Sequence, residues 1–187
     1  MHEIDEIVND SEQKQENDRE KNHFITVWIL DRIKDEIYDY CKQNMPNEAI
    51  GVLIGYRLSY EGQKYIKIVD WTTGEAEMGL TFARFTEEGV RQYSLFLDER
   101  YGSDNGFKDK KSDRPRVVGI FHSHPFGINP AFSATDYNTF LNFPYDAEHN
   151  VFILIDPKID VFKCFQVQKK NHVKNLVQVV WGEYGIQ

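Results

Sequence analysis

The stretch RVVGIFHSHPFGINPAFSATD, residues 116–136, contains the strongest structural signals of the chain. Its first part, RVVGIFH at 116–122, is mostly apolar and β-branched, which predicts a buried strand. The segment HPFGINPAF at 124–132 contains prolines and a glycine and is typical of a loop. SATDYNTFLNF at 133–143 then has the pattern of a short helix. A site can open where such a buried strand ends in a loop.

Further strands are predicted on both sides of this stretch. EAIGVLIGYRL at 48–58 is a mostly apolar run that contains glycines, and YIKIVDW at 65–71 alternates well enough to be its antiparallel neighbour. After the quoted stretch, VFILIDP and VFKCFQVQ form a predicted hairpin at 151–157 and 161–168. The remaining expected strands lie at 25–30, around 80–82, and at 175–181.

Two further helices are predicted before the quoted stretch. Asp31 offers an N-cap for an amphipathic helix over 32–44, where apolar residues recur at helical spacing. Thr86 is followed by two glutamates and starts a second helix that runs to about Glu99. This order of elements predicts an α+β fold, in which helices flank a mixed, mostly antiparallel sheet in α-β-α layers.

Length and composition favour one domain. The chain has 187 residues, of which 41% are hydrophobic and 14% aromatic, and this is enough apolar material for a single core. Residues 1–22 are charged and poor in aromatics, which predicts a flexible tail before a domain at 23–187. The formal net charge of -8 argues against binding to nucleic acid, because such proteins carry clustered positive charge.

The two cysteines and the apolar runs indicate a cytoplasmic protein. Cys41 lies in a helical pattern and Cys164 in a strand pattern, so both are predicted to be reduced thiols of the core. No cationic start followed by an apolar stretch marks a secretory leader, and no apolar run is long enough to span a bilayer. We therefore expect no membrane association.

The tetrapeptide HSHP at 122–125 is the first candidate for chemistry. Side chains alternate along a strand, so His122 and His124 at the end of one are expected to point to the same side. Two imidazoles on one side can share an ion of zinc or of a similar metal. A chain with six histidines can contain this triplet by chance, so its position at the end of a buried strand carries the inference.

Two carboxylates complete the candidate set, and each has a simpler alternative. Ser133 and Asp136 share a helical face, so Asp136 could be a third ligand, although the same pair resembles a capping box. Glu48 opens an apolar strand, where an acidic residue is usually a solvated strand end. If its strand lies beside the strand that ends at His122, Glu48 could accept a proton from a metal-activated water.

Together these residues resemble the JAMM motif of MPN-domain zinc metalloproteases. The resemblance rests on Glu48 in EAIGVLIG, on HSHP at 122–125 and on Ser133 and Asp136 in SATD, and it covers roughly residues 25–168. It implies one catalytic zinc ion held by His122, His124 and Asp136. It also implies that Glu48 is the general base and acid, and that Ser133 hydrogen-bonds the water or the developing oxyanion.

The resemblance also implies a substrate. Active members cleave peptide or isopeptide bonds at the C-terminal tail of ubiquitin or of ubiquitin-like modifiers, and some prokaryotic relatives act with E1-like and E2-like enzymes. The polar loop at 100–115 is expected to help bind such a tail, or else to be an ordinary solvated loop. Phe126 and Phe132 flank the motif and are expected either to contact substrate or to anchor their own loop.

Two departures from the family pattern bear on these expectations. Eight residues, 125–132, separate His124 from Ser133, where the usual motif has seven. The loop must therefore bulge by one residue, which affects the expected position of Ser133 more than that of Asp136. The segment 141–150 contains only His149 as a ligand type found in the second zinc site of some members, so no second zinc is expected.

Three alternatives remain open on the sequence alone. Many MPN domains have lost their metal residues and act as scaffolds or binding modules. A RadC-like protein linked to DNA carries a similar HxHP motif, but its usual middle residue is asparagine and the negative net charge here argues against it. Hydrolysis of a small amide is the third. The other histidines, His2, His23, His149 and His172, are expected to be surface or packing residues.

Overall fold

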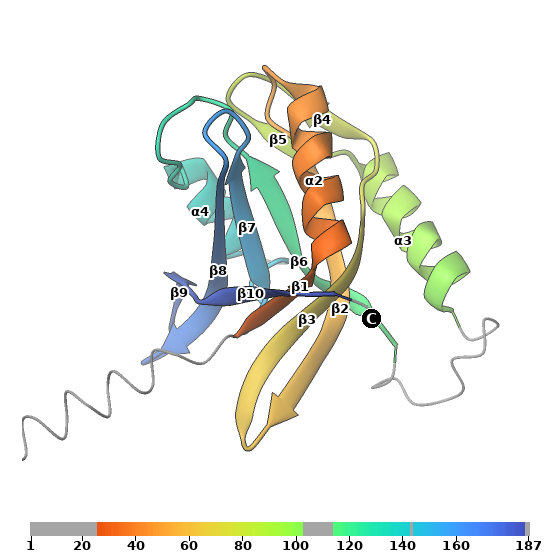
Figure 1. The fold of residues 1–187 in the computed structure, drawn as a ribbon, viewed down its shortest axis with the longest axis vertical. Helices are drawn as coiled ribbons and strands as arrows, with labels where there is room; N and C mark the ends of the chain where they lie inside the picture. Colours follow the sequence, from red (N-terminus) through yellow and green to blue (C-terminus); the bar gives the residue numbers. More distant parts are fainter. Residues whose placement is uncertain (1–25, 103–113, 143, 186–187) are drawn as a thin grey trace, which may run out of the picture.

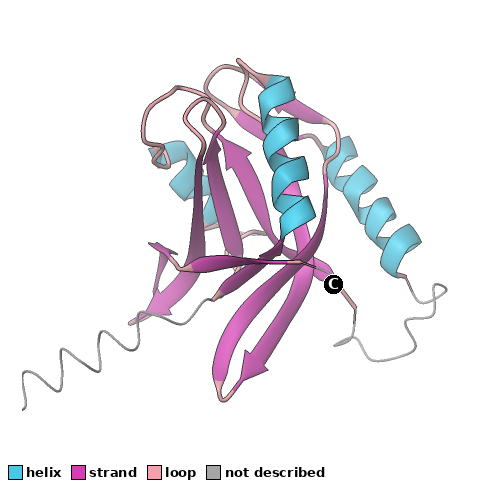
Figure 2. Ribbon diagram, in the orientation of Figure 1, coloured by secondary structure: helices cyan, strands magenta, loops and turns pink. Residues whose placement is uncertain are grey.

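The computed structural model describes residues 26–102, 114–142 and 144–185. Figure 1 shows the chain coloured along its sequence, and Figure 2 shows the same view coloured by helix and strand. The tail predicted at 1–22, and residues 103–113 of the loop predicted at 100–115, lie outside the described residues. Among those described, no helix has the length and the apolar composition needed to cross a bilayer.

One eight-stranded sheet organises the domain. Its strands lie side by side in the order β10-β1-β3-β2-β6-β7-β8-β9. β1 runs parallel to β3 and β10, and β6 runs parallel to β7, while the other neighbours are antiparallel. The predicted mostly antiparallel sheet is therefore confirmed. Its strands are β1 (Val27–Leu30), β2 (Ile50–Tyr60), β3 (Gln63–Thr72), β6 (Arg116–Ser123), β7 (Val151–Asp156), β8 (Val161–Lys170), β9 (Val173–Gln178) and β10 (Trp181–Tyr184).

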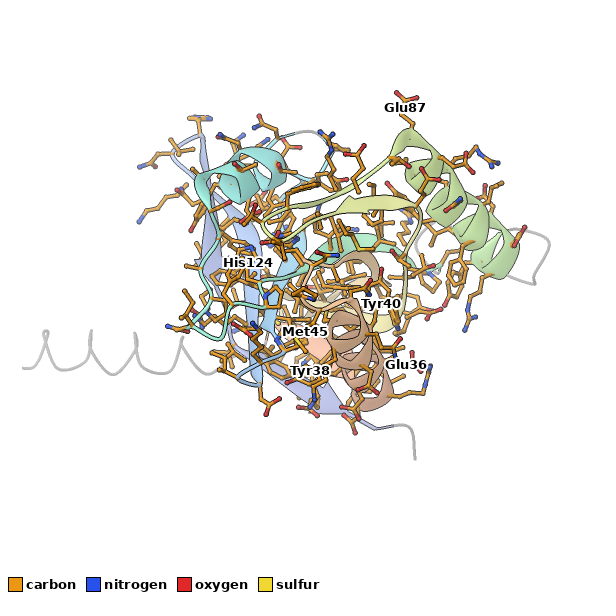
Figure 3. All side chains as sticks on the ribbon, turned by 90° about the horizontal axis from the view of Figure 1, so that it is seen from above. Glu36, Tyr38, Tyr40, Met45, Glu87 and His124 are labelled. Atoms are coloured by element: carbon orange, nitrogen blue, oxygen red, sulfur yellow. The ribbon has the colours of Figure 1, made fainter. Side chains whose placement is uncertain are left out.

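Helices cover both faces of this sheet, as the layered prediction requires. Seen from above, α2 (Asp31–Asn44) and α4 (Ala134–Phe140) lie on opposite sides of the central strands (Figure 3). Side chains of β6 alternate between them: Phe121 belongs to the apolar cluster around α2, whereas Ile120 belongs to the cluster around α4. By the same alternation, His122 lies on the α4 face.

A small hairpin lies between α4 and the third helix on the same side of the sheet as α4 (Figure 3). The hairpin consists of β4 (Ala76–Met78) and β5 (Ala83–Phe85), and it leads into α3 (Glu87–Tyr101). The predicted helix start is confirmed, because the Thr86 hydroxyl accepts the Gly89 N–H at 3.0 Å. The strand predicted at 80–82 is wrong, since these residues form the turn of the hairpin, which a Gly79 N–H to Phe82 O bond closes at 2.8 Å.

Three other differences from the predictions have a structural reason, while most remaining ends of the predicted elements shift by one or two residues. Asp31 is the first residue of α2 and Leu30 is its N-cap, because β1 runs directly into the helix. The helix predicted at 133–143 ends at Phe140. The strand predicted at 175–181 is two strands, because the chain leaves β9 after Gln178 and starts β10, at the other edge of the sheet, at Trp181.

Both cysteines are buried, free thiols, as predicted. Burial raises the pKa of the Cys41 thiol to about 12, although its hydrogen bond with Ser123 acts in the opposite direction. Burial also raises the pKa of Cys164 well above its ordinary value. Thiols held in their protonated form behave as small apolar side chains of the core.

Candidate metal centre

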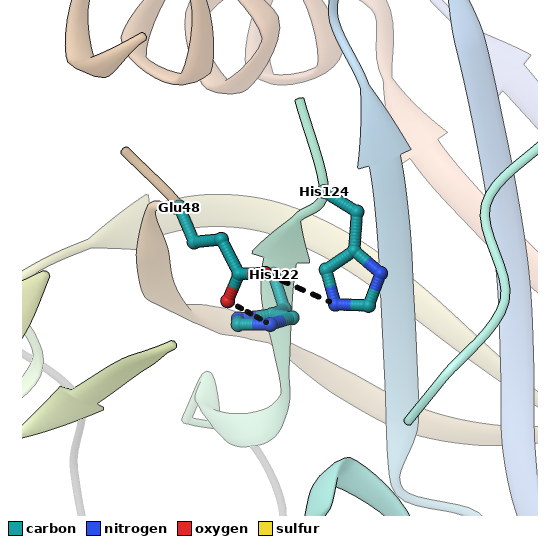
Figure 4. Close-up of side chains that lie close together, drawn as sticks. All are labelled: Glu48, His122 and His124. Atoms are coloured by element: carbon teal, nitrogen blue, oxygen red, sulfur yellow. Dashed lines mark ion pairs between the residues drawn. The ribbon is translucent and has the colours of Figure 1, made fainter. Parts of the chain in front are cut away.

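The pairing of β2 with β6 brings Glu48 to the histidine pair. Ile50 pairs with His122 in an antiparallel register, so the chain just before β2 lies beside the end of β6. The carboxylate of Glu48 lies 3.2 Å from His122 Nε2 and 3.7 Å from His124 Nε2 (Figure 4). The two imidazole rings are 4.8 Å apart at their centroids, and both belong to almost fully buried residues.

Asp136 reaches the same two nitrogens from α4. Its Oδ1 lies 3.5 Å from His122 Nε2, and its Oδ2 lies 3.3 Å from His124 Nε2. The structure therefore brings together the four predicted metal-site side chains, although His122 comes from β6, Asp136 from α4, and Glu48 and His124 from the loop segments before β2 and after β6. Each imidazole faces two carboxylates on the α4 face of the sheet.

The donor atoms of this cluster fit a divalent cation. Glu48, His122 and His124 offer ligand atoms that all lie within 4.8 Å of one another. Within the described part of the chain, neither ring nitrogen of His122 makes a hydrogen bond, although carboxylate oxygens lie 3.2 and 3.5 Å from Nε2, and an unpaired buried polar group is costly. A cation bound to one of them would offset that cost. Imidazoles combined with carboxylates suit zinc and neighbouring transition metals.

The cluster contains one carboxylate more than a three-ligand site needs. Both Glu48 and Asp136 lie close enough to the two imidazoles to be the third protein ligand. Whichever carboxylate does not bind the ion is placed to move protons beside it. A catalytic zinc site has this composition, because it keeps one coordination position open for water or substrate.

Asp136 is held in its charged form by its surroundings. Burial alone raises the pKa of this carboxyl, but the hydrogen bond with His124, the charge of His122 and the bonds with Ser133 lower it to about 2. The Ser133 N–H donates to Asp136 Oδ2 at 2.6 Å, and the Ser133 hydroxyl accepts the Asp136 N–H at 3.2 Å. The capping box given as the alternative for this pair is therefore present, and Asp136 faces the histidines as well.

The loop at 125–132 accommodates its additional residue through several anchors. Gly127 adopts a left-handed conformation with φ of 75°, and its N–H donates to the buried Asp156 carboxylate at 2.7 Å. Further along, Lys163 Nζ donates to Pro130 O at 2.8 Å. The loop is thus fixed at both ends of its bulge, and α4 still starts where Asp136 can reach the site.

The two phenylalanines of this loop have different environments. Phe132 is only 9% exposed, and its ring packs against Phe140 and Phe165. This is the anchoring arrangement given as the alternative to substrate contact. Phe126 is 43% exposed, and its ring centroid lies 5.4 Å from that of His124, so it forms part of the rim of the site.

Ser123 holds the segment that carries Glu48, a role that was not predicted from the sequence. Its side chain lies on the face opposite His122, where its hydroxyl accepts the Ala49 N–H at 2.8 Å. The Ser123 N–H donates to Ala49 O at 2.9 Å, and the Glu48 N–H donates to Gly79 O at 2.8 Å. The sequence signal for this role was the serine between the two histidines, because strand alternation turns its polar side chain toward the core.

A groove leads away from the cluster between the β4–β5 hairpin and α4. It has a volume of about 600 Å³, and Ser133 and Asp136 lie on its wall. This hairpin wall was not anticipated from the sequence, because strands of three residues give little periodicity. Other residues that line the groove are Glu77, Phe82, Arg84, Phe85, Thr139 and Phe140.

Comparisons with known proteins identify the family of this chain. One solved structure similar to this chain is that of protein DSY2949 from Desulfitobacterium hafniense, with 20% identity and a TM-score of 0.48 over 84% of this chain and 94% of that one. No curated protein sequence matches. The family model described as "Prokaryotic homologs of the JAB domain" matches residues 30–160, which is well over half of the chain and includes all four side chains of the cluster. The chain therefore belongs to the prokaryotic JAB-domain family and forms a single JAB/MPN-type α+β domain.

Proposed function

We propose that this protein is a zinc-dependent peptidase or isopeptidase that hydrolyses the bond at the C-terminal tail of ubiquitin or of a ubiquitin-like modifier. The observation that carries this proposal is the buried pair His122 and His124 between two carboxylates, beside an open groove. Membership of the JAB-domain family, which includes metalloisopeptidases, supports it.

In this proposal His122, His124 and Asp136 hold the ion. The low pKa of Asp136 supports its role as a ligand, because a carboxylate must be deprotonated to bind a metal. When bound, a zinc ion supplies a Lewis acid that polarises a carbonyl oxygen and makes a nearby water more acidic.

Glu48 is then the residue that moves protons. It takes a proton from the water that attacks the scissile carbonyl carbon, and it passes that proton to the nitrogen that leaves as an amine. The burial of Glu48 excludes bulk water from this transfer. The hydroxyl oxygen of Ser133 accepts a bond from the helix backbone, so its O–H can still donate into the groove, toward a developing oxyanion.

The groove is proposed to bind the modifier tail in an extended form. The β4–β5 hairpin forms one wall, and an extended chain can add to such a short sheet through main-chain hydrogen bonds. Leu80, Phe82 and Ile128 are exposed apolar residues in the hairpin turn and the loop at 125–132, where they offer contact area to a protein substrate. E1-like and E2-like enzymes are the partners expected in the same pathway.

The proposal is tested by metal analysis together with a cleavage assay. The purified protein is expected to contain stoichiometric zinc and to release the C-terminal partner from a panel of ubiquitin-like fusions, identified by mass spectrometry. A scaffold domain or a RadC-like DNA-associated protein would cleave none of them, and a scaffold would also purify without zinc. Chelation with EDTA should abolish cleavage, and added zinc should restore it.

Replacing Ser123 with alanine is expected to lower kcat by about tenfold to a hundredfold, because a small displacement of Glu48 weakens proton transfer. Zinc content and KM should remain unchanged, since neither the ligands nor the groove is altered. The Ala49 N–H also loses its partner, which should lower the free energy of unfolding by about 1–3 kcal/mol in urea titrations.

The matched control is Ser94→Ala, which removes an exposed hydroxyl from α3 and should change neither quantity by much. A loss of stability in Ser123→Ala with an unchanged kcat would restrict Ser123 to a purely structural role.

A further inference from the structure

A second pocket lies at the other end of β2. It has a volume of about 280 Å³ and is formed by the distal parts of β2 and β3, by the chain just before β7 and by β8. Arg57 is seven residues beyond Ile50, so the pocket is roughly 20 Å along the strand from the metal centre. The residues that line it are Arg57, Leu58, Lys64, Ile66, His149 and Gln166, together with Ser59 and Tyr65.

Positive charge gathers around this pocket, although the chain as a whole has a net charge of -8. Arg57, Lys64 and His149 line it. Burial lowers the pKa of His149, and the charges of Lys64 and Arg57 lower it further, while Glu148 acts in the opposite direction. Lys64 and Arg57 therefore lie close to His149 and disfavour the charged form of its ring. Like charges that meet in one concavity cost free energy unless an anion joins them.

Gln166 supplies a polar donor to the pocket. This residue of β8 is only 3% exposed, and it lines the same pocket. Its side-chain amide can donate N–H groups to acceptor oxygens of a molecule in the pocket.

Hydrogen bonds hold the Arg57 side chain and the backbone of His149 in position. The Arg57 guanidinium donates to Asn150 Oδ1 and to Val117 O, which fixes its orientation and leaves further N–H groups available. His149 adopts a left-handed backbone conformation with φ of 69°, and its N–H donates to Val167 O at 2.9 Å. Such a conformation costs free energy in a residue other than glycine, and it persists where contacts hold a side chain in place.

We propose that this pocket binds a phosphate group carried by a small organic molecule. A phosphate monoester has a charge of about -1.5 to -2 and three acceptor oxygens, which matches the two cations Arg57 and Lys64 and the amide of Gln166 better than a carboxylate does. Leu58 and Ile66 form an apolar wall that can accept the organic part. The metal centre and its proposed reaction do not enter this inference.

The test uses the full-length, zinc-loaded protein with three probes: adenosine monophosphate, inorganic phosphate and adenosine. Calorimetric titration at constant ionic strength should give saturable binding of the monophosphate, and the His149 ring signals should shift in NMR spectra. Adenosine should not bind. Tighter binding of the monophosphate than of inorganic phosphate identifies an ester as the ligand, and equal binding identifies the phosphate group alone as sufficient.

Two variants locate the binding, and one serves as a control. Lys64→Gln should weaken binding of the monophosphate by about tenfold, and Gln166→Met by a few-fold. Lys169→Gln removes the same charge from β8 three residues beyond Gln166, where the side chain points to the other face, and it should leave binding unchanged. The proposal is overturned if neither phosphate probe shifts the His149 signals, or if Lys64→Gln and Lys169→Gln weaken binding equally.

Discussion

Glu48→Gln is expected to lower kcat by about 10³-fold while zinc remains stoichiometric. Glutamine preserves the size of the side chain but cannot accept the proton of the attacking water, and general acid–base catalysis contributes about 10²–10⁴-fold in enzymes. Since Asp136 is assigned as the third ligand, the ion should stay bound. The measurements are initial rates of cleavage of a modifier fusion and zinc content by atomic emission.

The reciprocal substitution, Asp136→Asn, makes this result decisive. It should lose zinc as well as activity, because an amide is a much weaker ligand than a carboxylate. Both carboxylates lie within 3.2–3.7 Å of the two imidazoles, so distance alone does not assign their roles. If Glu48→Gln loses zinc and Asp136→Asn keeps it, the two roles are exchanged. If Glu48→Gln still cleaves at the original rate, the mechanism fails.

His122→Ala is expected to abolish both zinc binding and cleavage, and with them the stabilisation that zinc provides. A ligand that binds only the folded state adds about 4 kcal/mol when its free concentration is 1,000 times its Kd. For a domain of this size that corresponds to a rise of roughly 10 °C in Tm. EDTA should therefore lower the Tm of the unaltered protein by about this amount and leave the Tm of the variant unchanged.

Comparing each protein with its own EDTA-treated sample separates metal loss from the cavity that alanine leaves at this buried position. His172→Asn is a suitable control, because it removes a histidine with φ of 64° at an exposed turn, a conformation that asparagine accepts. That control should respond to EDTA like the unaltered protein. A His122→Ala variant that still loses stability in EDTA would show that the ion binds elsewhere.

Local sequence patterns predicted those parts of the site that depend on residues close together in the chain. Strand alternation predicted that His122 and His124 point to one side, and their rings indeed lie together, although β6 ends at Ser123. Helical spacing predicted that Ser133 and Asp136 share a face. Glu48 lies close to the histidines because β2 pairs with β6. The sequence predicted a role for Glu48 only if these two strands were neighbours, and the observed register meets that condition.

Features that depend on distant contacts were not predictable in the same way. The chain crosses from β9 to β10 at the opposite edge of the sheet, and β10 pairs in parallel with β1, more than 150 residues earlier in the chain. No local pattern specifies such a partner. The hairpin at 76–85 was missed because its strands are too short to show periodicity, and the burial of Phe132 depends on Phe165 of β8.

The register between β2 and β6 also determines which folded molecules can bind the metal ion. A slip of one residue would turn His122 to the α2 face and bring Ser123 to the α4 face. A misaligned chain would then lack the ligands for the ion, so only correctly paired molecules could take it up. Metal binding would therefore favour molecules in which β2 and β6 pair in the native register, because mispaired chains would lack the ligands for the cation.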